Sequence, residues 1–221
     1  MSTGSITRTG TTTSTDEIVR YDFAERAVHW INALAYTYCM LTGLALFTPF
    51  LYWIAAVLGG GPTIRFWHPW VGLVYLVTVL WMQAKWKADM APIPQDAQWD
   101  KNIKNYIQNK DEGMPAQGRF NAGQKTFWKV MFWCAFILLI TGIVMWFPEM
   151  MPRGLHSLLT VLVFIHVVTA LVTIAAFIIH VYMSVWMTPG SMKAMTDGTV
   201  SARWARAHHS LWYERITGRK S

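Results

Sequence analysis

The stretch from Leu158 to Tyr182 reads LLTVLVFIHVVTALVTIAAFIIHVY and decides the fold of this chain. It contains no Asp, Glu, Lys or Arg, and about 20 apolar residues in a helix suffice to cross the hydrocarbon core of a bilayer. A helix of a soluble bundle would carry a polar stripe toward water, and neither this stretch nor Phe132–Phe147 has one. We therefore expect a membrane-spanning helix here.

Three further apolar stretches, at 27–50, 66–86 and 127–147, join the one at 155–187. Of the 221 residues, 53% are hydrophobic and 14% are charged, against about a quarter charged in soluble domains. This composition excludes a disordered chain, and it argues against a nucleic-acid binder although the net charge is +7. We predict an all-α fold, an integral membrane four-helix bundle.

The positive charges predict the orientation. Of the 19 Lys and Arg, three precede the first span, eight lie around the loop between the second and third spans, and six follow the fourth, whereas each remaining loop holds one. Basic residues concentrate on the cytoplasmic side, so both termini and the middle loop are expected there. The predicted organisation is a flexible Thr/Ser-rich tail (1–20), a transmembrane domain (21–190) and a cytoplasmic C-terminal tail (191–221).

Four of the seven histidines lie inside apolar stretches, where an ionisable side chain is costly and usually functional. His29 and His180 fall in the cytoplasmic half, and His68 and His166 fall in the outer half. Two pairs at two depths predict two b haems with histidine ligands to iron on both sides, an inner one on His29 and His180 and an outer one on His68 and His166. The alternative is a purely structural role, in which the histidine forms a hydrogen bond between helices. That role can account for a single histidine within a span, but it is a poor explanation for four at matched depths.

The spacing within the last span supports this interpretation. His166 and His180 are 14 residues apart, which at about 100° per residue places both on one helix face and roughly 21 Å apart along the axis. Helix bundles supply axial haem ligands in this way, whereas a zinc site would gather its ligands around one ion. His208 and His209 lie in the polar tail and are expected at the surface.

Two arginines accompany the histidines. Arg26 and Arg65 each stand three residues before a predicted ligand, His29 and His68, and therefore share its helix face. Each is a candidate partner of haem propionates, which arginine binds well. The alternative, an anchor at the membrane interface, stays equally open. Three glycines lie near the histidines, and they are Gly43, Gly72 and Gly142. Their lack of a side chain either leaves space for a flat porphyrin or allows close packing of helices.

The sequence resembles the gamma subunit of membrane-bound respiratory formate dehydrogenase, a dihaem cytochrome b, from about Asp22 to Tyr213. The segments that carry the resemblance are Arg26-Ala-Val-His29-Trp30, His68-Pro69 with Gly72, Asn121-Ala-Gly-Gln-Lys125, His166 with His180-Val-Tyr-Met183, and Val200-Ser-Ala-Arg-Trp204 with His208-His209 and Trp212-Tyr213. Phe120 stands where this branch of the family is expected to have tyrosine, and the long Thr-rich N-terminus is a second departure.

The resemblance implies a bacterial inner-membrane complex of three subunits. A molybdenum or tungsten alpha subunit oxidises formate, an iron–sulfur beta subunit passes electrons to the outer haem, and the gamma subunit reduces a membrane quinone. With two cysteines in all, this chain has no iron–sulfur motif, so it is expected to transfer electrons and not to oxidise formate itself. The haem histidines are shared with cytochrome b subunits of nickel–iron hydrogenases, which remain the alternative.

Two other classes of protein fit the sequence less well than an electron-transfer subunit. A structural anchor without haem would also have four membrane spans, but it would not need the paired histidines within them. A transporter with histidine proton relays would carry acidic residues within its spans, and every Asp and Glu here lies outside the apolar cores.

The quinone is expected at the cytoplasmic side, beside the inner haem. Asn121 and Gln124 offer hydrogen bonds to a quinone carbonyl, and Gly123 lets a ring approach the backbone. His180 could hold iron through one ring nitrogen and turn the other toward the quinone. The resemblance points to Asn121, Gly123 and His180, and less firmly to Gln124. Alternatively, Asn121 only caps the following helix.

Overall fold

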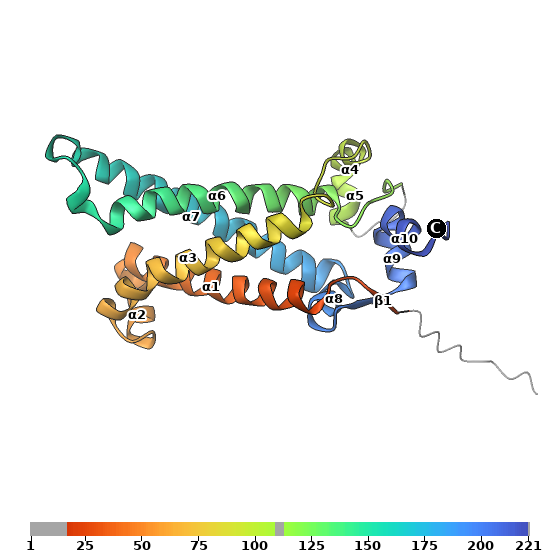
Figure 1. The fold of residues 1–221 in the computed structure, drawn as a ribbon, viewed down its shortest axis with the longest axis horizontal. Coiled ribbons are helices and arrows are strands. Elements are labelled where there is room, and N and C mark those ends of the chain that lie inside the picture. The colour runs from red at the N-terminus through yellow and green to blue at the C-terminus, as the bar shows by residue number, and fades with distance from the viewer. Residues whose placement is uncertain (1–16, 109–112, 221) are drawn as a thin grey trace, which may run out of the picture.

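The computed structural model describes residues 17–108 and 113–220 and contains four long helices (Figure 1). They are α1 (Phe23–Phe47), α3 (Gly61–Trp86), α6 (Ala122–Trp146) and α7 (Ser157–Tyr182), each of 25 or 26 residues. Helix α1 packs along α3 and α6 packs along α7, while contacts of α3 with α6 and of α1 with α7 join the two halves. The protein is therefore a helical bundle, as predicted.

Among the described residues, three helical segments are long and apolar enough to cross a membrane. They are α1, α6 and the continuous stretch Ser157–Met187, in which α7 runs on into the π-helical turn η4 (Met183–Met187). Helix α3, of 26 residues, is not among these three segments; it contains Arg65, His68, Pro69 and several tryptophans. The apolar segments make this a membrane protein.

Two of the long helices begin with reciprocal side-chain caps. Asp22 accepts a hydrogen bond from the Glu25 amide at 2.8 Å, and the Glu25 carboxylate accepts one from the Asp22 amide at 2.9 Å. Asn121 and Gln124 form the same arrangement at the start of α6, at 2.9 and 3.0 Å. Each cap satisfies amides that have no partner within the helix, a contribution of about 1 kcal/mol.

Short elements close both ends of the bundle. One end carries η1 (Pro49–Leu51), α2 (Trp53–Val57), η2 (Pro148–Met150) and η3 (Arg153–Leu155). The opposite end, called the tail end here, carries α4 (Asp96–Lys101), α5 (Ile103–Ile107), α8 (Ser191–Thr196), α9 (Ala202–His208), α10 (Ser210–Thr217) and a two-stranded sheet (Figure 1). In that sheet β1 (Glu17–Val19) pairs antiparallel with β2 (Thr199–Ser201).

The predicted flexible tail 1–20 is wrong in its last four residues. Glu17–Val19 form β1, and Arg20 is buried, with 3% of its surface exposed. Residues 1–16 lie outside the described part of the chain. The expectation of a surface position for His209 is also wrong, since His209 is 2% exposed. Both residues are buried because the C-terminal segment folds back onto the start of α1 through the sheet.

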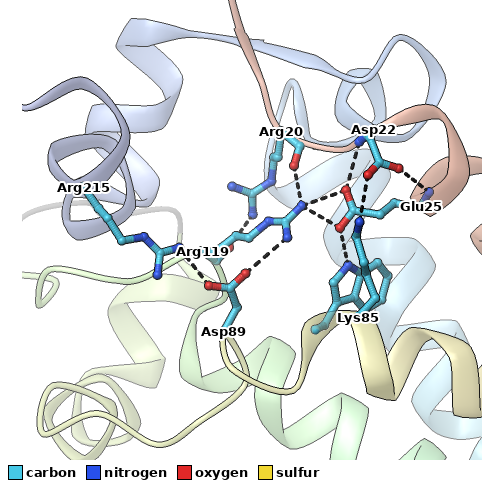
Figure 2. A network of polar contacts seen from close by, with 8 residues as sticks. Arg20, Asp22, Glu25, Lys85, Asp89, Arg119 and Arg215 are labelled. Atoms are coloured by element: carbon cyan, nitrogen blue, oxygen red, sulfur yellow. Dashed lines mark hydrogen bonds and ion pairs between the residues drawn. The ribbon is translucent and has the colours of Figure 1, made fainter.

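A network of ion pairs and hydrogen bonds, buried around Glu25 and exposed at its edges, holds these segments together (Figure 2). The Glu25 carboxylate accepts hydrogen bonds from Arg119 Nη2 at 2.9 and 3.0 Å and from Trp86 Nε1 at 2.7 Å. Arg119 also donates to Asp89 at 3.2 Å, and Asp89 binds Arg215 of α10 at 2.8 Å. The network thus connects α1, α3, the loop before α6 and the C-terminal helix.

Candidate functional site

The outer histidine pair lies between α3 and α7. The rings of His68 and His166 are 6.4 Å apart, centre to centre, with an angle of 57° between their planes. Each ring is also fixed by a buried threonine on a neighbouring helix. Thr42 Oγ1 of α1 lies 2.7 Å from His68 Nδ1, and Thr141 Oγ1 of α6 lies 2.8 Å from His166 Nδ1.

The inner pair lies between α1 and α7, nearer the tail end. The rings of His29 and His180 are also 6.4 Å apart, at 51°. Phe127 of α6 stacks on the His180 ring at 4.5 Å and 9°. His29 Nδ1 is buried, and no hydrogen-bond partner is found for it in the described part of the chain. The two pairs predicted from sequence are thus the pairs that the fold brings together.

The separation of the rings fits a metal held between them. A metal–imidazole bond is about 2 Å, so two rings on opposite sides of one ion have their centres a little more than about 6 Å apart. Among the described residues, no three His, Cys, Asp or Glu side chains cluster as for a metal held by protein ligands alone. Pairs of this kind suit a metal whose other positions come from a macrocycle, as in haem.

Space for a flat group exists beside the outer pair. A cavity of about 640 Å³ is lined by His68, His166, Gly43, Gly72 and Gly142, within the usual size of cofactor pockets. A Cβ added at Gly43 would lie 3.7 Å from His68 Cε1, and one at Gly142 would lie 3.5 Å from His166 Cε1. Glycine at both positions keeps the space beside the rings open, so the residues present fit a haem.

The two arginines differ in their surroundings. Arg65 lines the outer cavity together with His68, where it can reach an anionic group. Arg26 Nη1 donates to the Thr196 carbonyl at 2.6 Å, and its Nε is buried with no hydrogen-bond partner in the described part of the chain. Arg26 therefore fastens α8 to α1.

The four predicted quinone residues all line one second cavity, of about 240 Å³, at the tail end. They are Asn121, Gly123, Gln124 and His180. The cavity lies under α5 and beside α6 and α7, and it includes the Phe127 ring that stacks on His180. A ligand in this cavity would therefore lie next to the inner histidine pair.

Asn121, Gly123 and Gln124 also have structural roles at the start of α6. Asn121 caps α6 through its Oδ1, the predicted alternative, yet its Nδ2 points to Tyr106 Oη at 3.4 Å. A Cβ at Gly123 would lie 2.7 Å from Trp99 Cη2, so packing of Trp99 requires glycine there. The Gln124 side chain is used in the cap.

Tyr106, Thr188 and His209 are among the lining residues of this cavity that the sequence interpretation missed. Tyr106 Oη lies 3.4 Å from Thr188 Oγ1, and His209 contributes to the same wall. Tyr106 lies in the polar loop between the second and third predicted spans, and Thr188 lies just after the fourth. His209 belongs to a segment that carries the family resemblance, but no local sequence pattern predicts that its side chain is buried.

The comparisons with known proteins agree with this architecture. The model of the prokaryotic cytochrome b561 family matches residues 20–198, so the chain belongs to that family of haem proteins, which implies a b-type haem. Among its relatives is the cytochrome b556(Fdn) subunit of nitrate-inducible formate dehydrogenase of Escherichia coli K12, 33% identical over 200 residues that cover 90% of this chain and 91% of the relative.

Two further relatives carry related names. The cytochrome b556(fdo) subunit of Escherichia coli K12 formate dehydrogenase is 31% identical over 205 residues, covering 91% of this chain and 94% of the relative. The formate dehydrogenase cytochrome b556 subunit of Haemophilus influenzae is 26% identical over 196 residues, covering 89% and 82%. The resemblance predicted from the sequence is thereby confirmed.

Proposed function

We propose that this protein is the membrane subunit of a formate dehydrogenase complex and carries electrons from a partner iron–sulfur subunit to a membrane quinone. In this proposal α3 is the fourth span, and two b haems are bound, the inner one by His29 and His180 and the outer one by His68 and His166. A b haem with two imidazole ligands supplies one-electron transfer. The single observation that carries the proposal is the equal 6.4 Å separation of the two ring pairs.

The names of the relatives support formate over hydrogen as the source of electrons, because each of the three is a formate dehydrogenase subunit. Formate oxidation belongs to a molybdenum or tungsten subunit in the same complex. The distribution of Lys and Arg supports a bacterial inner-membrane protein with both termini cytoplasmic. The tail end, with its small cavity, then faces the cytoplasm.

The chain's own residues at that cavity can bind a quinone. Asn121 Nδ2 and the Tyr106 hydroxyl are hydrogen-bond donors to a carbonyl oxygen, and they lie 3.4 Å from each other. Thr188 Oγ1, 3.4 Å from Tyr106 Oη, shares a hydrogen bond with that hydroxyl and can hold it in place. The rings of Trp99 and Phe127 and the Ile179 side chain provide apolar walls for a quinone ring.

Haem quantification in the purified protein tests the proposal. The pyridine haemochrome assay should give two b haems per chain for the wild type. His29→Ala and His68→Ala should each leave one haem, with different midpoint potentials in a redox titration. One haem or none in the wild type contradicts the two-site assignment. Copurification with molybdenum- or tungsten-containing and iron–sulfur subunits, identified by mass spectrometry, tests the assembly.

A further inference from the structure

Two threonines stand in matching positions in the two halves of the bundle. Leu41-Thr42-Gly43-Leu44 of α1 and Ile140-Thr141-Gly142-Ile143 of α6 have the same pattern. Each threonine contacts a histidine on the following long helix, 26 residues later for His68 and 25 residues later for His166. Thr42 is 0% exposed and Thr141 is 3% exposed, so water does not compete for these contacts.

The direction of each hydrogen bond follows from the atoms around the threonine hydroxyl. Thr42 Oγ1 lies 2.8 Å from the Tyr38 carbonyl, and Thr141 Oγ1 lies 2.7 Å from the Ile137 carbonyl. A carbonyl oxygen only accepts, so each hydroxyl proton is directed to the carbonyl. The hydroxyl oxygen is then left to accept a hydrogen bond from the histidine Nδ1–H. In both rings Nε2 consequently keeps the free lone pair that binds a metal.

The inner pair has no such arrangement. His29 Nδ1 is buried without a partner in the described part of the chain, and the His180 ring is held by stacking on Phe127. A hydrogen bond from the second ring nitrogen of a ligand makes that ligand more basic and fixes its orientation. A more basic ligand favours the more positive, oxidised metal. The two histidine pairs are therefore chemically different although their ring separations are equal.

We infer that Thr42 and Thr141 are positioning residues that fix the Nδ1–H tautomer of His68 and His166 and hold the outer haem at a lower reduction potential than the inner haem. This inference rests on the proposed haem binding. A lower potential at the outer site favours electron transfer from the outer to the inner pair, toward the cavity that holds Asn121. The threonines thus set the direction of transfer without touching the substrate.

Potentiometric titration of threonine variants, with haem content measured in parallel, tests the inference. Thr42→Val and Thr141→Val remove only the hydroxyl, and both together should shift the outer haem's one-electron equilibrium toward reduction by about tenfold, which is about 59 mV. The reduction potential of the inner haem should not change. Thr42→Ser and Thr141→Ser keep the hydroxyl and should restore the wild-type potential.

Thr78→Val is the matched control. Thr78 is a buried threonine of α3 whose hydroxyl also lies near carbonyls of its own helix, those of Val74 and Tyr75, and it has no hydrogen bond to a histidine. This variant should leave both potentials unchanged. Loss of the outer haem alone in a Val variant, reversed by Ser, also supports the positioning role. Unchanged potentials in the double variant, a shift of equal size in the control, or loss of both haems overturns the inference. A wild type without two haems instead contradicts the proposed function.

Discussion

Arg20 and His209, 189 positions apart in the sequence, meet in the interior of the tail end, where Arg20 Nη2 donates to His209 Nε2 at 3.0 Å. Because a guanidinium group is always a donor, His209 must be neutral, with its proton on Nδ1, which donates to the Gly118 carbonyl at 2.7 Å. The Arg20 guanidinium lies 5.0 Å from the Trp204 ring and 5.1 Å from the Trp212 ring. This pair fastens the C-terminal segment to the first residues of the bundle.

The pair predicts that stability falls in mild acid. Burial lowers the pKa of His209 well below its ordinary value, and the neighbouring Arg20 charge lowers it further. The unfolded chain binds a proton below about pH 6.5, while the folded protein does not, so the free energy of unfolding is highest above that pH. It should fall by up to about 1.4 kcal/mol per pH unit as the pH drops toward the folded-state pKa.

Melting temperatures of the purified haem-loaded protein in detergent, between pH 5 and pH 8, measure this effect. His209→Gln should lower the melting temperature at pH 8 and flatten its dependence on pH. His156→Gln, which changes an exposed histidine at the other end of the bundle, serves as the control and should keep the wild-type slope. A wild-type slope retained in His209→Gln would show that another group titrates.

A second prediction compares a buried and an exposed ion pair of the network in Figure 2. Removing Arg119 with Arg119→Met leaves Glu25, 2% exposed, without its cation. Breaking a buried ion pair from one side costs about 3 kcal/mol or more. Lys85→Met breaks the Asp22–Lys85 pair, whose side chains are 49% and 43% exposed, and should cost about 1 kcal/mol at most. Unfolding in mixed detergent micelles compares the two; similar losses would contradict the difference expected from burial.

The sequence predicted the long helices well and the tail end poorly. The apolar stretches 27–50 and 127–147 became helices over Phe23–Phe47 and Ala122–Trp146. The shift of a few residues at each start arises because the caps at Asp22 and Asn121 are polar and lie before the apolar run. The spans could be predicted because crossing a bilayer requires a long apolar helix, whichever apolar residues it is made of. The helical period also predicted that His166 and His180 of α7 lie on the same face of the helix.

Burial at the tail end depends on partners that are distant in sequence. Arg20 and His209 are polar residues in polar stretches, and only the pairing of β1 with β2 brings them together. Tyr106 reaches the small cavity from α5, a helix of only five residues within a polar loop. No local pattern encodes such contacts, because each requires the folded position of a second segment. The residues of the inner and outer pairs were predictable because both members lie at defined depths in long helices.

A third prediction tests the role of glycine beside the outer histidines. The Cβ of a larger residue at position 142 would lie 3.5 Å from His166 Cε1, and Gly142→Leu would extend further into the 640 Å³ cavity. This variant should lose the outer haem and keep the inner one. Gly154→Leu is the control, because no atom lies within 4 Å of a Cβ there. Two haems per chain in purified Gly142→Leu would place the outer haem elsewhere.

A fourth prediction concerns orientation. Reporter proteins fused at the C-terminus and in the loop between α3 and α6 should be active only as cytoplasmic reporters. A fusion near Gly60, at the opposite end of the bundle from the C-terminal helix (Figure 1), should be active only as a periplasmic one. Periplasmic activity at the C-terminus would reverse the proposed direction of electron flow. The two fusion sites within loops also serve as controls for each other.

The last prediction separates the two proposed roles of Asn121, capping α6 and donating a hydrogen bond to a quinone. Its Oδ1 caps α6, while its Nδ2 faces Tyr106 at the small cavity. Serine is as good a helix cap as asparagine but has no amide donor at that place. Asn121→Ser should therefore keep both haems and normal stability, whereas Asn121→Ala should lose about 1 kcal/mol of stability as well. Both variants should slow reoxidation of the reduced haems by quinone by about fivefold, the equivalent of one hydrogen bond of about 1 kcal/mol.

Stopped-flow spectroscopy of the dithionite-reduced protein, mixed with a soluble quinone, measures this rate, and titration with a quinone-analogue inhibitor measures affinity. Asn102→Ala is the matched control. Asn102 is another asparagine of the segment between α3 and α6, its Nδ2 donates to the Gln98 carbonyl, and it is not among the residues that line the cavity. It should behave as the wild type. Wild-type reoxidation and inhibitor affinity in Asn121→Ser would mean that Asn121 only caps α6, and the quinone would then have to bind at another surface of the bundle.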